Sequence, residues 1–161
     1  MVMSGSTTEA RGVEPTSEDV LALLRRQAML YARLESFAGR QRSLVVAEDT
    51  GSLLSILSDR QKLSVELGQL AGLFEPIRRQ WSDVRARLSP PQQAEAEGLL
   101  EDIKHRLRNV IDADEEDARL LSARKQCAAD DLRSLQSTQR VLHAYGTQTN
   151  TASSLALDEA T

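Results

Sequence analysis

Aromatic and cysteine residues are scarce in this chain of 161 residues, and each shortage argues against some classes of protein. Only two phenylalanines, two tyrosines and one tryptophan are present. Pockets of globular enzymes usually carry more aromatic side chains, so this composition favours a narrow bundle of two or three helices over an α/β enzyme. Cys127 is the single cysteine, which excludes an intrachain disulfide and predicts the reducing cytosol as the compartment.

The chain also lacks a strong net charge and a long apolar run. Its 20 basic residues oppose 24 acidic ones, and the resulting net charge of -4 creates no field that favours nucleic acid or an anionic membrane. No apolar run is long enough to span a bilayer, and the N-terminus has no apolar segment typical of an export signal. We expect a cytoplasmic protein that binds no nucleic acid and inserts into no membrane.

Catalytic and metal-binding patterns are missing as well. Asp102 and His105 are spaced for one helical face, but a di-metal carboxylate bundle needs two such pairs and facing glutamates. The acidic run 112–117 lacks the glycine of a calcium loop. His105 has the chemistry to carry a phosphoryl group in a phosphorelay. However, no glycine follows the basic residue after it, so no small residue opens access for a response regulator. We expect no metal, no cofactor and no enzymatic activity.

The most regular pattern present is an apolar residue at every third or fourth position between residues 53 and 88. Only Arg60 interrupts this series. Such spacing places the apolar side chains on one stripe of an α-helix, as in coiled coils and helical hairpins. Similar stripes run from Val20 to Val45 and from Leu100 to Tyr145. The predicted fold is all-α: a long antiparallel hairpin, or a three-helix coiled-coil-like bundle, with an overhanging third helix.

Turn and capping residues predict the boundaries of these helices. We expect a disordered leader at 1–15, a single helical domain at 16–146 with helices near 17–48, 52–88 and 90–146, and a flexible tail at 147–161. Thr16 and Asp19 form a capping-box pattern, and Thr50 or Ser52 is the expected N-cap of the second helix. Pro76 predicts a kink near 72–76 without an end to that helix.

The third predicted helix is longer than its neighbours, so about twenty of its residues should extend past the hairpin. This overhang carries an amphipathic stripe without an internal partner: Cys127, Ala128, Leu132, Leu135, Leu142 and Tyr145. One interpretation is that a helix of a client protein lies along the stripe. The alternative is self-association, or the first helix folding back over it.

A polar layer is predicted to cross the apolar seam. Antiparallel helices pair residues at equal distances from their connecting turn, which places Arg60 opposite Asp114 or Asp117 on the third helix and near Gln41 on the first. A shifted register would leave one of these groups unpaired in an apolar seam, so the layer would fix the register. The alternative is that these long side chains merely reach solvent at the edge of the bundle.

Two segments resemble the FlgN-type flagellar export chaperones. They are LYARLESFAGRQRSLVVAEDTGSLLSILSDRQKLSVELGQL and VIDADEEDARLLSARKQCAADDLRSL. The matching features are a first helix that ends in Leu30, Leu34 and Gln41, a short turn at 48–52, a second helix that opens with Leu53, Ile56, Leu57, Arg60 and Gln61, and Asp114 three residues before Asp117. The resemblance covers about residues 18–146.

This resemblance implies a cytoplasmic, non-enzymatic chaperone of flagellar type III export. Members of that family bind the C-terminal helical regions of hook-associated proteins, prevent their premature assembly and deliver them to the export gate. The implied partners are hook-associated flagellar proteins and the flagellar export apparatus. Two alternatives stay open: a structural or adaptor coiled-coil protein that forms homo-oligomers, and a phosphorelay module that would require His105.

Overall fold

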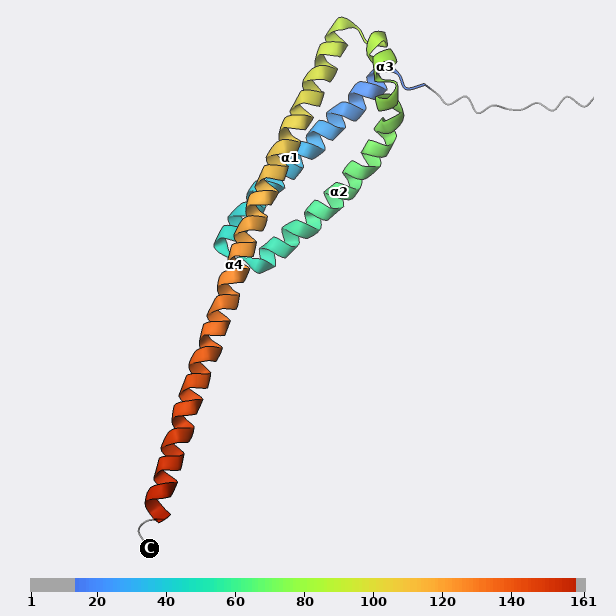
Figure 1. Ribbon diagram of the computed structural model, residues 1–161. Helices are drawn as coiled ribbons and strands as arrows, with labels where there is room; N and C mark the ends of the chain where they lie inside the picture. Colours follow the sequence, from blue (N-terminus) through green and yellow to red (C-terminus); the bar gives the residue numbers. More distant parts are fainter. Residues whose placement is uncertain (1–13, 159–161) are drawn as a thin grey trace, which may run out of the picture. The chain divides into compact units, whose positions relative to one another are not determined.

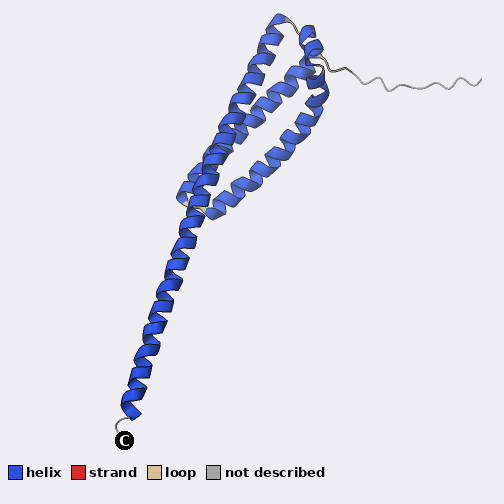
Figure 2. Cartoon of the chain, viewed as in Figure 1, coloured by secondary structure: helices blue, strands red, loops and turns tan. Residues whose placement is uncertain are grey.

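The computed structural model describes residues 14–158, with side-chain surroundings described as far as residue 147. Within residues 14–158 it contains four helices and no strand (Figure 2), which confirms the predicted all-α class. The helices are α1 (Ser17–Ala47), α2 (Thr50–Arg79), α3 (Trp81–Arg87) and α4 (Pro90–Asp158). Nearly all of the predicted leader lies outside the described residues. No helix in this range combines the length and apolar character needed to cross a membrane.

The chain divides into two compact units, Met1–Asp114 and Glu115–Thr161. We call them the N-terminal unit and the C-terminal unit. The N-terminal unit contains α1, α2, α3 and the first part of α4, and the C-terminal unit contains the rest of α4.

Side chains at the helix starts explain where α1 and α2 begin. The hydroxyl of Thr16 accepts a hydrogen bond from the Asp19 N–H at 3.1 Å, and the Asp19 carboxylate accepts one from the Thr16 N–H at 2.9 Å. The Thr16 hydroxyl also donates to Asp19 Oδ2 at 2.6 Å, and this bond, together with the one from the Thr16 N–H, lowers the pKa of Asp19. The N-cap of α2 is Asp49, not the predicted Thr50 or Ser52, because its carboxylate accepts the Ser52 N–H at 3.0 Å.

The second predicted helix is broken in the structure, which corrects the single helix predicted over 52–88. α2 continues through Pro76, ends at Arg79, and α3 begins at Trp81. Proline donates no N–H to the preceding turn and crowds it. The chain leaves helical geometry at Gln80, with φ -111 and ψ 28, and its N–H donates to the Ile77 carbonyl at 3.2 Å.

The apolar spacing nevertheless continues across this break. The rings of Phe74 in α2 and Trp81 in α3 lie with their centroids 6.3 Å apart at an interplanar angle of 50°. Val84 and Leu88 then join the same core cluster as Phe74. Packing, and not helix continuity, therefore keeps this stripe on the core side.

The core of the N-terminal unit consists of two apolar clusters. α1 and α2 form the antiparallel hairpin (Figure 1). One cluster joins all four helices through Val20, Leu21, Leu24, Phe74, Ile77, Val84, Leu88 and Ala96. The other joins α1, α2 and α4 through Leu30, Leu34, Ala38, Leu63, Leu67, Leu70 and Val110. Leu107 lies within the stripe predicted from Leu100 to Tyr145, but it exposes 37% of its surface.

Helix α4 extends beyond its predicted end at Gly146. The structure continues it to Asp158, so most of the predicted tail 147–161 is helical, and residues 159–161 lie outside the described part. A glycine inside a helix costs only about 1 kcal/mol relative to alanine. It ends a helix when it takes a left-handed conformation, and no glycine among residues 14–158 has a positive φ.

Candidate functional site: the exposed stripe of α4

All six predicted client-binding residues are exposed in the C-terminal unit. We call them the C-terminal stripe: Cys127, Ala128, Leu132, Leu135, Leu142 and Tyr145. Leu132, Leu135, Leu142 and Tyr145 expose 59%, 63%, 66% and 67% of their surface. Every residue from 130 to 147 is exposed, so the stripe lies on a helix whose other side chains are equally open to solvent.

Spacing explains why these side chains share one face. Steps of four, three, seven and three residues separate Ala128, Leu132, Leu135, Leu142 and Tyr145, and such steps return to the same side of an α-helix. The stripe is therefore an apolar row on one side of the helix, interrupted by Gln139 between Leu135 and Leu142, and a second amphipathic helix can recognise such a row.

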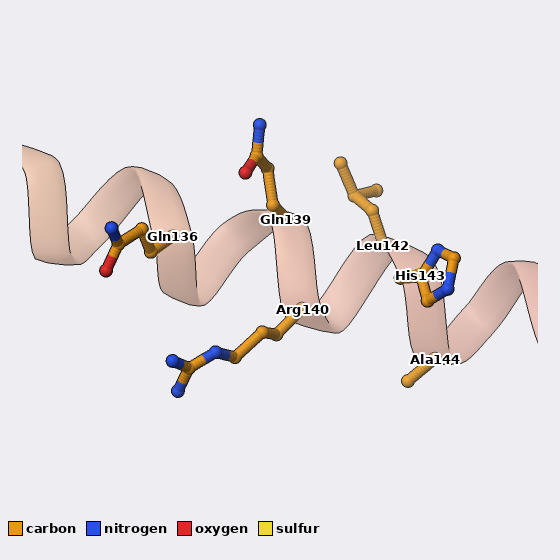
Figure 3. A pocket seen from close by; sticks show the side chains of 6 residues that line it. All are labelled: Gln136, Gln139, Arg140, Leu142, His143 and Ala144. Atoms are coloured by element: carbon orange, nitrogen blue, oxygen red, sulfur yellow. The ribbon is translucent and has the colours of Figure 1, made fainter.

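A surface hollow at the end of the stripe is no small-molecule pocket. Gln136, Gln139, Arg140, Leu142, His143 and Ala144 line it, and all come from α4. Figure 3 shows these side chains pointing away from one helix in different directions. Small-molecule sites are concave and enclose most of their ligand, which one convex helix surface does not do.

The predicted polar layer is present in the N-terminal unit, where three of its residues meet. Arg60 donates from Nη1 to Asp114 Oδ1 at 2.7 Å and from Nη2 to Asp114 Oδ2 at 2.8 Å. Its Nη1 also donates to Gln41 Oε1. The Arg60 side chain is 13% exposed and that of Asp114 is 42% exposed. The fourth predicted member, Asp117, belongs to the C-terminal unit and is buried, with 3% of its surface exposed.

This geometry supports register control for Arg60, Gln41 and Asp114. A bidentate guanidinium–carboxylate pair has fixed directions as well as charge, so a slipped helix would break both bonds at once. Losing the Asp114 carboxylate would remove this bidentate pair from a mostly buried guanidinium, which costs free energy.

A second polar link joins α1 to α4, and the sequence patterns did not predict it. Glu35 accepts from Arg106 Nη1 at 2.6 Å and from Asn109 Nδ2 at 2.7 Å. The hydrogen bond from Asn109 lowers the pKa of Glu35, and Arg106 adds to this effect against the opposing influence of desolvation. Glu35 and Arg106 both lie outside the apolar stripes, so the apolar periodicity does not mark them as partners.

The structure also describes the surroundings of His105 and Cys127. His105 is exposed, with Nε2 3.4 Å from Asn109 Nδ2. Among residues 14–158, no three histidine, cysteine, aspartate or glutamate side chains gather into a group that could hold a metal ion. Cys127 carries an exposed free thiol.

Comparison with protein-family models, with curated proteins and with solved structures finds no match to this chain. The resemblance to FlgN-type chaperones therefore depends on the sequence of residues 30–70 and 110–135.

Proposed function

We propose that this protein is a cytoplasmic, non-enzymatic chaperone of flagellar type III export that binds the C-terminal helical region of hook-associated proteins. One observation carries this proposal: the C-terminal stripe exposes its leucines and its tyrosine along one face of α4. The family resemblance supplies the identity of the client and of the export apparatus as second partner.

Solvation favours a partner on this stripe. Moving a leucine side chain from water into an apolar contact is worth about 1.5–3 kcal/mol. Burial of three leucines and Tyr145 in one row works against the cost of ordering an incoming helix. Helices with such a face are commonly recognised by side chains at i, i+3, i+4 and i+7.

The same contact would account for a chaperone effect. A client helix that assembles through its apolar face cannot do so while that face is buried on the stripe. Release at the export machinery requires that the complex be reversible, and a single-row contact between two helices is smaller than a standard permanent interface.

Binding to purified C-terminal helical regions of hook-associated proteins from the same organism tests the proposal. We expect wild type to bind, and Leu132→Asp with Leu135→Asp to weaken binding at least about a hundredfold, since central leucines would be desolvated hot spots. The matched control, Gln136→Asp with Ser137→Asp, adds the same charge to the same stretch without removing a leucine. We expect its affinity to stay within about threefold of wild type.

Equal weakening in both double variants would contradict the proposed site, and no binding by wild type would contradict the proposed client. The rival function, a self-assembling coiled-coil adaptor, predicts that the wild-type mass rises with concentration in light scattering. That rise should vanish in Leu132→Asp with Leu135→Asp. The phosphorelay alternative predicts loss of function in His105→Gln.

A further inference from the structure

A groove runs between α1 and α2 in the N-terminal unit. Two neighbouring hollows form it, and Asp59 lines both. We call it the hairpin groove and define it by Arg33, Phe37, Arg40 and Leu44 of α1 with Ile56 and Leu63 of α2. It is distinct from the C-terminal stripe, which lies in the other unit.

The floor of the hairpin groove is apolar and firmly placed. Ile56 and Leu63 are 5% and 4% exposed, and Phe37 and Leu44 are half-buried. Leu63 belongs to a core cluster, and Phe37 packs against the same cluster. The floor is thus continuous with the core, which keeps the groove in shape.

The α1 rim of the groove carries positive charge. Arg33 and Arg40 lie seven residues apart on α1, about 10.5 Å along the axis, and both are exposed. Among the described residues, Arg33 makes no ion pair. Arg40 lies with its guanidinium carbon 5.9 Å from the centre of the Phe37 ring and also makes no ion pair.

The α2 rim, in contrast, is already neutralised. Asp59 pairs with Lys62 at 3.5 Å, and Glu66 pairs with Arg26 at 2.7 Å. An incoming helix therefore meets two available guanidinium groups on one side and satisfied charges on the other.

Helix α4 does not occupy this groove within the N-terminal unit. It contacts the hairpin through Glu35 of α1 and Arg60 of α2. Glu35 and Phe37 are two residues apart, so they point to nearly opposite sides of α1.

We propose that the hairpin groove binds an acidic amphipathic helix of a partner protein. Its apolar side chains contact Phe37 and Leu44, and two of its carboxylates, seven residues apart, pair with Arg33 and Arg40. Charged residues that flank a helical seam select partners in the same way in coiled coils.

A second copy of this chain is a poor occupant. Carboxylates seven residues apart occur at two places in the sequence, Asp59 with Glu66 and Glu95 with Asp102. The first pair forms the opposite rim of the groove itself. In the second, Glu95 pairs with Arg25 at 2.6 Å and Asp102 with Arg106 at 2.9 Å.

Two synthetic helical peptides with the same apolar face test the proposal. One carries glutamates at two flanking positions seven residues apart, and the other carries lysines there. In fluorescence anisotropy, we expect wild type to bind the glutamate peptide at least about tenfold more tightly than the lysine peptide, and this preference to fade in 1 M salt.

Variants of the rim assign the preference to its residues. Arg33→Glu with Arg40→Glu should reverse it, and Arg33→Gln with Arg40→Gln should abolish it while changing the fold least. The control Arg108→Glu with Arg119→Glu makes the same charge change at exposed arginines outside the groove and should retain the preference. Leu132→Asp with Leu135→Asp should retain it too, which separates this site from the stripe.

Equal binding of both peptides, no binding of either, or the same loss in the rim and control variants would overturn the proposal. So would a peptide-free dimer of wild type that dissociates in Arg33→Gln with Arg40→Gln, because the groove would then be a contact between copies.

Discussion

The two units carry the same apolar spacing and use it in opposite ways. In the N-terminal unit, residues such as Leu24, Leu30 and Leu63 are at most 4% exposed. In the C-terminal unit, Leu132 and Leu135 follow the same three- and four-residue steps and are 59% and 63% exposed. Such spacing therefore predicts a helix and its apolar face, whereas coverage of that face depends on what lies beside it.

Charged residues show the same difference. Besides pairs within one helical turn, the N-terminal unit has ion pairs that connect separate helices, as in Arg25 with Glu95 and Arg106 with Glu35, both at 2.6 Å. Those described in the C-terminal unit stay within one turn of α4, as in Arg133 with Asp130 at 3.4 Å. Pairs between helices fix packing and register, whereas pairs within a turn add only a few tenths of a kcal/mol to the helix itself.

The largest expected difference between the units comes from deleting one leucine in each. Leu24 is 0% exposed, so Leu24→Ala should lower the free energy of unfolding by about 2–5 kcal/mol. Leu135→Ala should change it by less than about 0.5 kcal/mol. Urea denaturation followed by circular dichroism measures both, and equal losses would show that the two stripes are packed alike.

The polar layer gives the next largest effect. Asp114→Ala removes the bidentate Asp114 carboxylate from the Arg60 guanidinium, which is 13% exposed, and should cost about 1–3 kcal/mol. Arg60→Leu should cost less and leave the fold intact, because the aspartate it releases is 42% exposed and reaches water. Denaturation of both variants provides the comparison. Loss of helicity in Arg60→Leu would mean that the seam requires the charge.

Local patterns predicted much of this fold. The stripes placed Val20, Leu30 and Leu34 in the core, and the capping residues at Thr16 gave the start of α1. Equal distances from the connecting turns predicted that Gln41, Arg60 and Asp114 meet, and the hydrogen bonds of Arg60 confirm this. These predictions succeed because helix spacing and hairpin register depend on short stretches of sequence.

Other features depend on competition between nearby groups or on distant parts of the chain. Asp49 caps α2 although Thr50 and Ser52 are also suitable, and Gln80 ends a helix whose apolar spacing continues. Gly146 has no positive φ, and α4 continues past it to Asp158. The contact of Glu35 with Arg106 depends on packing between α1 and α4, which no local spacing reports.

That contact predicts a smaller, pH-dependent difference between the units. The pKa of Glu35 is lowered in the folded protein, so its stabilisation is complete above the unfolded pKa of about 4.5 and is lost as the pH falls through the folded value. Glu35→Gln should lower stability by about 1 kcal/mol at pH 7 and converge with wild type in acid. Glu115→Gln in the C-terminal unit should be nearly neutral. Parallel urea curves at pH 7 and pH 3 test both substitutions.

The smallest effect on stability is expected for substitutions in the C-terminal stripe, on which the proposed function depends. Leu132→Asp with Leu135→Asp changes exposed side chains on a helix surface, so amide hydrogen exchange in the N-terminal unit should match wild type within experimental error. Amides of residues 127–145 should exchange faster than those of the core in both proteins, since only their own helix protects them. Lower protection of the N-terminal unit in this variant would show that these leucines stabilise the core. Retained protection would show that these leucines do not stabilise the core, as expected for side chains that bind a partner.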